Sequence, residues 1–144
     1  MLVSLKLKNF KQHRDLEVDF ASGMTLITGK NYSGKSNLVK GVRFALGGAA
    51  TLPGVASSIP TRGEAKGSTK VVLTMNINGS LYEVTRTMSS ATLKKDGERV
   101  ATGNKAVNAE IEDLLGVDKN TFDLLKYVRI RSELLSAFYG KDIF

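Results

Sequence analysis

Cysteine is absent from this 144-residue sequence, and histidine occurs once. Disulfide bonds and thiolate metal sites are therefore excluded, and a histidine-rich zinc site is not expected. Apolar stretches stay shorter than ten residues, too short to cross a bilayer. The first residues, Met1 to Lys6, lack the basic segment and long apolar run of a signal peptide. We therefore expect a cytoplasmic protein that does not associate with membranes.

Proline is also scarce, and both copies lie between residues 48 and 69 with four glycines and several serines and threonines. This composition predicts a long loop, and long loops in compact domains are often functional. Elsewhere the chain has enough apolar residues, 42% hydrophobic in total, for the packed core of one domain. This content argues against a disordered tail.

Acidic residues are outnumbered, 14 against 21 lysines and arginines, and the formal net charge is +7. Residues 1–60 hold eight basic and three acidic residues. This imbalance suits an anionic partner such as a nucleotide, a nucleic acid or an acidic protein, but it equally suits a solvated surface. The same two interpretations, a DNA-backbone site or a solvated face, apply to six basic residues of the later half: Lys66, Lys70, Arg86, Lys94, Lys95 and Arg99.

The first half alternates between apolar and polar residues over 3–8 and 16–20, which predicts two half-buried strands. A short apolar run, 24–28, predicts a buried strand that leads into a loop with glycine and lysine. From Ser36 the period becomes helical, and Gly47-Gly48 can end that helix. Its apolar face consists of Leu38, Val39, Val42, Ala45 and Leu46.

The second half predicts two hairpins and a helix. Strands over 70–78 and 81–88 meet at Asn78-Gly79, and a smaller pair over 92–95 and 98–101 meets at Asp96-Gly97. A helix near 104–115 follows and ends at Gly116. The apolar residues expected along that helix are Val107, Ile111, Leu114 and Leu115. Asp118 can cap a further helix, and a last helix is expected to begin within 132–144.

A phosphate-binding loop is predicted at Gly29–Ser36, which fits the pattern G-x-x-x-x-G-K-[ST] at every fixed position. Its glycines let successive backbone N–H groups turn inward to cradle phosphate oxygens, and the following helix adds its N-terminal dipole. Lys35 would reach the β- and γ-phosphates of a nucleotide, and the Ser36 hydroxyl would coordinate magnesium.

The second half of an ATPase site is missing. Hydrolysis needs a further magnesium ligand and a group that positions water, and the carboxylate usually ends an apolar strand downstream. No apolar strand after residue 60 ends in Asp or Glu, and Glu112 and Asp113 lie on a helical pattern. We therefore expect this chain to carry one half of an ATPase, with the other half elsewhere.

The order of these motifs resembles the N-terminal segment of the SbcC and SMC ATPases, which belong to the ABC ATPase superfamily. Asn9-Phe10-Lys11-Gln12-His13 follows the first strand, and the phosphate loop and Ser36-Asn37-Leu38 come next. The first 48 residues resemble both groups equally. The later part favours SbcC, on the residues Tyr82 to Arg86, Leu114 to Val117, Phe122, and Tyr127 to Arg129.

The resemblance implies an α/β P-loop NTPase head, whose N-terminal lobe has antiparallel hairpins beside a Walker A strand, loop and helix. Residues 1–144 would be the N-terminal half of that head, and a coiled coil would begin near 132–144. The implied cofactors are ATP and Mg²⁺. The implied partners are the C-terminal half of the head, a second head in an ATP-dependent dimer, double-stranded DNA and an SbcD-type nuclease. Such a protein is an ATPase only when completed, regulates an exonuclease and is associated with the nucleoid.

Carried over to this sequence, the family's nucleotide site includes Lys11, near the phosphates, and Thr61-Arg62-Gly63, beside the nucleotide. The complete set is Lys11, Asn31, Tyr32, Ser33, Gly34, Lys35, Ser36, Asn37, Thr61, Arg62 and Gly63, with Lys35 catalytic and Ser36 the metal ligand. For Lys11 and for the Thr61 segment, a surface lysine and a flexible loop tip are the ordinary alternatives. His13 is interpreted as a turn residue rather than a catalytic base.

Two positions depart from the family's pattern. Its Q-loop glutamine corresponds here to Ile130, or to Arg131 with a shift of one residue, and no glutamine follows Gln12. Either Ser132 or Glu133 substitutes for it, or the contact with magnesium and water is lost. At the other position, Tyr32, the family usually has Gly or Ser.

Three other functions are considered. An SMC-type head would load onto DNA without a nuclease. A nucleotide-dependent clamp with little turnover would agree with the missing glutamine. A small-molecule kinase or GTPase is disfavoured, because the chain lacks a second metal carboxylate and a base-recognition motif.

Overall fold

Six strands form one sheet in the computed structural model, which describes residues 2–20, 35–52 and 54–116. The strand order is β2-β1-β3-β4-β5-β6, and every neighbouring pair is antiparallel. The strands are β1 (Leu2–Phe10), β2 (His13–Asp19), β3 (Lys70–Ile77), β4 (Ser80–Thr87), β5 (Ala91–Lys95) and β6 (Glu98–Thr102). The first hairpin therefore joins the later ones through β1 and β3, which are separated by about sixty residues of sequence.

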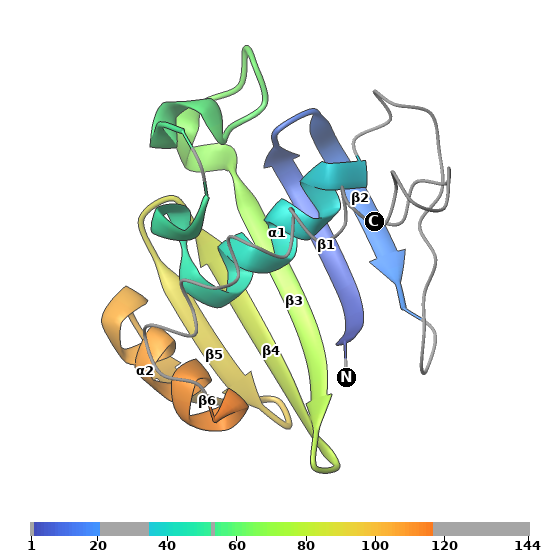
Figure 1. Cartoon of the computed structure of the whole chain (residues 1–144), viewed down its shortest axis with the longest axis vertical. Coiled ribbons are helices and arrows are strands. Elements are labelled where there is room, and N and C mark those ends of the chain that lie inside the picture. The colour runs from blue at the N-terminus through green and yellow to red at the C-terminus, as the bar shows by residue number, and fades with distance from the viewer. Residues whose placement is uncertain (1, 21–34, 53, 117–144) are drawn as a thin grey trace, which may run out of the picture.

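Two helices cover one face of this sheet (Figure 1). Helix α1 (Lys35–Gly47) crosses it diagonally and contacts β1, β3 and β4, whereas α2 (Asn104–Leu115) packs on β5 and β6. Three short 3₁₀ turns lie between α1 and β3: η1 (Ala49–Thr51), η2 (Ala56–Ser58) and η3 (Lys66–Ser68). Among the described helices, none is long and apolar enough to cross a membrane.

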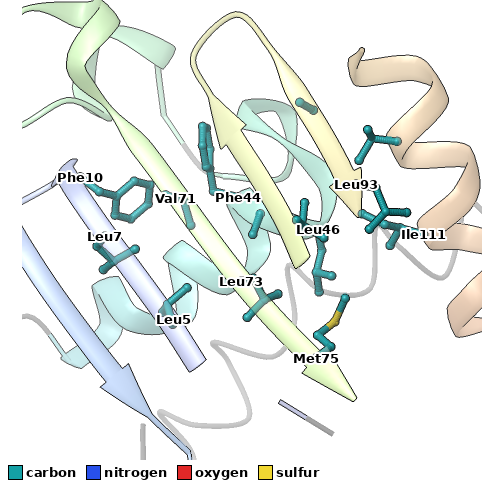
Figure 2. Close-up of a cluster of buried hydrophobic side chains, with 14 of the residues drawn as sticks. Leu5, Leu7, Phe10, Phe44, Leu46, Val71, Leu73, Met75, Leu93 and Ile111 are labelled. Carbon is teal, nitrogen blue, oxygen red and sulfur yellow. The ribbon is translucent and has the colours of Figure 1, made fainter. Parts of the chain in front are cut away.

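The core lies between the sheet and the two helices, as Figure 2 shows. Alternate residues of each inner strand point into it, because side chains alternate between the faces of a strand. The buried apolar residues of the strands are Leu5, Leu7 and Phe10 of β1, Val71, Leu73 and Met75 of β3, Tyr82 and Val84 of β4, and Ala91 and Leu93 of β5. Helix α2 adds Val107 and Ile111, both 0% exposed. Each large apolar side chain buried in this way contributes about 1.5–3 kcal/mol.

Both predicted hairpin turns are confirmed. Asn78 and Gly79 have φ values of 52° and 83°, and Asp96 and Gly97 have 49° and 87°. Two consecutive positive φ values match the type I′ turn, which Asn-Gly and Asp-Gly favour. The two hairpins are also joined to each other, because the Leu81 N–H donates to Asp96 Oδ1 at 2.9 Å and the Asp96 N–H donates to the Leu81 carbonyl at 2.7 Å.

Both helices predicted within the described residues are also confirmed. Helix α2 ends as expected at Gly116, which has φ 63° and ψ 28°. The prediction that Leu115 lies on its packed face is wrong, because this side chain is 39% exposed. The strand predicted over 24–28 and the helices predicted after residue 117 lie outside the described residues.

The described residues of the long loop predicted over 48–69, which leave out residue 53, form only the 3₁₀ turns and one isolated bridge, between Phe10 and Pro60. It is not a detached surface loop, however. Leu52 and Ile59 are buried in the common core, at 7% and 2% exposure. The loop is therefore packed against the end of β1.

Candidate functional site

The part of the phosphate loop that the structure describes is the start of α1. Lys35 is the first residue of the helix, and Ser36 follows as an exposed residue in its first turn. No acidic residue lies in that turn. The first N–H groups of a helix have no partners within the helix, and they carry its positive dipole end. The first turn of α1 is therefore suited to an anion such as a phosphate.

Close packing fixes α1 against β1. A Cβ atom added at Gly41 would lie 2.7 Å from Leu7 Cδ2, so any larger residue there would displace this buried leucine side chain. One turn further on, the Phe44 and Phe10 rings pack at a centroid distance of 5.6 Å, tilted by 53°. The position of Ser36 and Asn37 thus depends on contacts made along the whole helix.

The turn between β1 and β2 has an unusual backbone. Asn9 and Lys11 both have positive φ values, 47° and 54°. Asparagine tolerates this region, but a lysine there is uncommon. Lys11 is the first of two residues between the paired Phe10 and His13, and Gln12 does not share its positive φ. A two-residue turn with only its first φ positive favours glycine at that place.

The Lys11 side chain folds toward η2. Its Nζ donates to the Ser58 carbonyl at 3.2 Å and lies 3.4 Å from Ser58 Oγ. Partial burial lowers the pKa of Lys11 from its usual value, because the charged form loses hydration. The ammonium group therefore lies at the junction of the β1–β2 turn and the 58–61 segment.

That junction is closed by four further hydrogen bonds. The Lys11 N–H donates to the Ile59 carbonyl at 2.7 Å, and the Thr61 N–H donates to the Asn9 carbonyl at 3.2 Å. The Thr69 hydroxyl also donates to the Asn9 carbonyl at 2.8 Å, and the Thr61 hydroxyl donates to the His13 carbonyl at 3.4 Å. These bonds give hydrogen-bond partners to backbone groups that would otherwise lie without one away from water.

The structure thus brings together Lys11 and Thr61, two predicted site residues far apart in sequence. Thr61 is 8% exposed, whereas the neighbouring Arg62 and Gly63 are exposed. His13 belongs to β2 and pairs with Phe10, so it lies at the edge of the turn as expected. Predicted site residues Asn31, Tyr32, Ser33 and Gly34 lie outside the described residues, as does Ile130.

Arg86 corrects a prediction. Both interpretations offered for it, a DNA-backbone contact and a solvated residue, are wrong, because its side chain is only 1% exposed. It shares the inward face of β4 with Tyr82 and Val84. The alternation of that strand contained the signal, since residues two apart point to the same face.

A metal site made of protein side chains alone is not found in the described ranges, which contain no cluster of three His, Cys, Asp or Glu.

Residues 4–142 match the family described as "AAA domain". The chain therefore belongs to this family. Within it, the chain is an N-terminal ATPase head segment of the Rad50 and SbcC type, related to the heads of SMC and RecF proteins.

Two relatives and one structure illustrate this placement. The chain is 37% identical over 126 residues to the DNA double-strand break repair Rad50 ATPase of Methanocaldococcus jannaschii, covering 85% of the chain and 12% of that protein. It is 48% identical over 46 residues to the chromosome partition protein Smc of the same organism, covering 32% of the chain and 4% of that protein. The chain thus spans about an eighth of the length of the Rad50 relative.

The fold is similar to that of a solved SMC ATPase, from work on ATP-driven dimerization and DNA-stimulated activation. The TM-score is 0.58 at 20% identity, and the match covers 94% of this chain and 97% of the other. At this level of identity, the likeness concerns the fold.

Proposed function

We propose that this chain is the ATP-binding half of the head of an SbcC-type DNA-repair ATPase. The observation that carries this proposal is the coincidence of Lys35 and Ser36 with the first turn of α1. The motif demands a helix at that point, and the structure has one there. Lys35 would pair with the β- and γ-phosphates of ATP, and Ser36 would hold Mg²⁺.

Lys11 is the second part of the proposed site. A lysine occupies a backbone position that favours glycine, and its ammonium group is partly buried at a junction of two segments. Unfavourable backbone conformations concentrate at functional sites. We therefore assign to Lys11 a contact with nucleotide phosphate, with Arg62 on the adjoining exposed loop as a further cation.

The test of ATP binding is Lys35→Ala, measured by calorimetry with Mg-ATP in the head completed by its C-terminal half. Losing a charge-assisted contact to phosphate costs about 2–3 kcal/mol or more, so binding should disappear at ordinary concentrations. Lys105→Ala, on the exposed side of α2, is the matched control and should bind normally. Unchanged affinity in Lys35→Ala would refute the assignment.

Hydrolysis is proposed to need the C-terminal half, in an ATP-dependent dimer of heads. The sequence has no strand ending in a carboxylate after residue 60 and has Ile130 where the family has glutamine. Charge in the transition state would be poorly stabilised by this half alone. Phosphate release by the chain with and without its partner tests the idea, and turnover by the chain alone would contradict it. Little turnover in the completed head would favour a nucleotide-dependent clamp.

We also propose that the protein binds duplex DNA, and with it that it associates with the nucleoid and controls an SbcD-type nuclease. The proposal is based on the family and on basic residues of the outer face of the sheet. There, Lys8 pairs with Lys70 and Lys94 pairs with Arg99 across neighbouring strands. Like charges directly opposite are destabilising, and an anionic partner would reduce that repulsion, although Asp15 lies opposite Lys8 and Glu83 opposite Lys94 on the other neighbouring strand. The acidic residues of β2 would repel such a partner, so we expect it to bind away from that edge strand.

Salt dependence tests the DNA proposal. The slope of log affinity against log salt should be about −0.9 per phosphate neutralised, and replacing both Lys94 and Arg99 with glutamine should reduce it by about two such units. Lys105→Gln, on α2, is the control. A flat response to salt would contradict DNA binding.

An SMC-type head is the second candidate, and the extent of the matches supports the SbcC type over it. The Rad50 match covers 85% of the chain and the Smc match 32%. Co-purification of the completed protein with an SbcD-type nuclease would favour the SbcC type.

A further inference from the structure

Arg86 extends from β4 to the place where α1 ends and α2 begins. Its Nε donates to the Ala45 carbonyl at 3.0 Å, and its Nη2 lies 3.5 Å from the Leu46 carbonyl. On the other side, Nη1 donates to Asn104 Oδ1 at 3.1 Å and Nη2 donates to Asn108 Oδ1 at 2.7 Å. One guanidinium group therefore holds the last turn of one helix and the first turns of another.

The charge of Arg86 is balanced in an unusual way. In the part of the chain that the structure describes, no carboxylate pairs with it, and its four acceptors are carbonyl and amide oxygens. Burial lowers the pKa of Arg86 to about 10, so it remains protonated at neutral pH. Gly48 makes room for it, since a Cβ there would lie 3.2 Å from Arg86 Nη1.

The two helices do not hold this cation equally. The C-terminal end of α1 carries a partial negative charge, which attracts a guanidinium group. Asn104 is the first residue of α2, so the positive end of that helix dipole opposes the same cation. The two asparagine oxygens offset this repulsion, and the buried Val107 and Ile111 side chains hold α2 on the sheet. The acceptors on α1 are backbone carbonyl groups, whereas those on α2 are side-chain amides, which can rotate away, so the contact with α2 is the one that can be released.

We propose that Arg86 is a positioning residue that couples nucleotide occupancy at the start of α1 to the docking of α2. This inference rests on the proposed binding of ATP. A 13-residue helix behaves as a rod, so a ligand at Lys35 and Ser36 that fixes one end also fixes the carbonyl groups at the other. With α1 fixed, Arg86 is held in the place where Asn104 and Asn108 reach it.

The first variant that tests the coupling is a change at Asn108. Asn108→Ala removes one bond of Arg86 and leaves the α1 contacts in place, so folding should be retained. Amide exchange in α1 and α2 is followed in the completed head with and without Mg-ATP. In the parent protein, Mg-ATP should slow exchange in both helices. In Asn108→Ala it should slow exchange in α1 only, and by linkage Mg-ATP should bind about fivefold more weakly.

Arg86→Lys and Lys105→Ala complete the set. A lysine keeps the charge but cannot reach four acceptors in a fork, so Arg86→Lys should also lose the response of α2. Lys105→Ala, on the exposed side of the same helix, should behave as the parent.

The outcomes separate this inference from the proposed function. Binding of Mg-ATP that slows exchange in α1 but leaves α2 unchanged in the parent would overturn the coupling and leave ATP binding intact. The coupling would also be overturned if Asn108→Ala speeds amide exchange in α2 equally with and without nucleotide and leaves the affinity for Mg-ATP unchanged. A purely structural contact would behave in this way. No binding of Mg-ATP by the parent would overturn the proposed function itself, and the coupling with it.

Discussion

The two ends of α1 differ in almost every respect. The first turn is exposed at Ser36, carries no acidic residue and lies open to an anionic ligand. The last turn is buried, and its Ala45 and Leu46 carbonyl groups face the guanidinium group of Arg86. The negative end of the α1 dipole thus faces a buried cation, and its positive end is the place proposed for an external anion. The first turn of α1 is therefore available for a ligand, and the last turn contributes chiefly to the stability of the fold.

Arg86→Met should have the largest effect, on stability. It leaves the buried Ala45 and Leu46 carbonyl groups without their donor, and each unpaired buried group of this kind costs about 1–3 kcal/mol, so we expect a loss of about 2–6 kcal/mol in total. The free energy of unfolding by urea measures it. Arg99→Met, at an exposed position of β6, should change the same quantity by less than about 0.5 kcal/mol. Equal changes in unfolding free energy in the two variants would show that the Arg86 contacts at the buried end of α1 do not stabilise the fold.

Gly41→Ala tests the middle of the helix, between the two ends. The added Cβ would overlap Leu7 in a packed core, and overpacking costs about 1–3 kcal/mol, partly offset by up to about 1 kcal/mol of helix propensity. Gly67→Ala is the matched control, because nothing lies within 4 Å of its added Cβ. Thermal and urea unfolding report the difference, and a Gly41→Ala protein more stable than the parent would mean that the close approach of α1 to β1 is not maintained.

Lys11→Asn separates binding from stability at the ligand end. Asparagine adopts positive φ more readily than lysine, so the free energy of unfolding should stay constant or rise by about 0.5 kcal/mol despite the lost Ser58 contact. Mg-ATP affinity should nevertheless fall, because a cation near the phosphates is removed. Urea unfolding and calorimetry on the same variant test both parts, and unchanged affinity would remove Lys11 from the proposed site.

The smallest expected effect is an absence of pH dependence. The pKa of Arg86 is lowered to about 10 but stays above the physiological range, so the folded and unfolded chains both keep this proton between pH 6 and 9. The difference in unfolding free energy between the parent and Asn108→Ala should thus be constant over that range. A difference that shrinks below pH 9 would mean that another group titrates with the Arg86 contacts.

Much of the fold follows from local patterns. Alternation predicted the strands, and Asn78-Gly79 and Asp96-Gly97 predicted both turns, because these features depend only on neighbouring residues. The pairing of β1 with β3 was not predicted, since it depends on the packing of segments far apart in sequence. The same limit applies to Leu115, because its place on the helical pattern does not reveal that its side chain is 39% exposed.

The candidate site shows the same division. Lys35 and Ser36 could be predicted, because the phosphate loop is a contiguous pattern whose helix the structure has at that place. The junction that brings Thr61 to Asn9 and His13 could not, because it depends on backbone hydrogen bonds between distant segments. Arg86 was assigned to the surface on its residue type, although the alternation of Tyr82 and Val84 placed it inside.

The Arg86 contacts also affect the order in which the chain can fold during synthesis. The acceptor Ala45 lies 41 residues before Arg86, and the acceptor Asn108 lies 22 residues after it. As the ribosome releases the chain from its N-terminus, α1 can form early, but its carbonyl end has no cation until β4 has emerged. Until then, the helix that carries Lys35 and Ser36 lacks the Arg86 contacts and is held by its packing on β1 and β3 and by the hydrogen bonds between Arg43 and Thr51. We therefore expect ATP binding to develop late in translation.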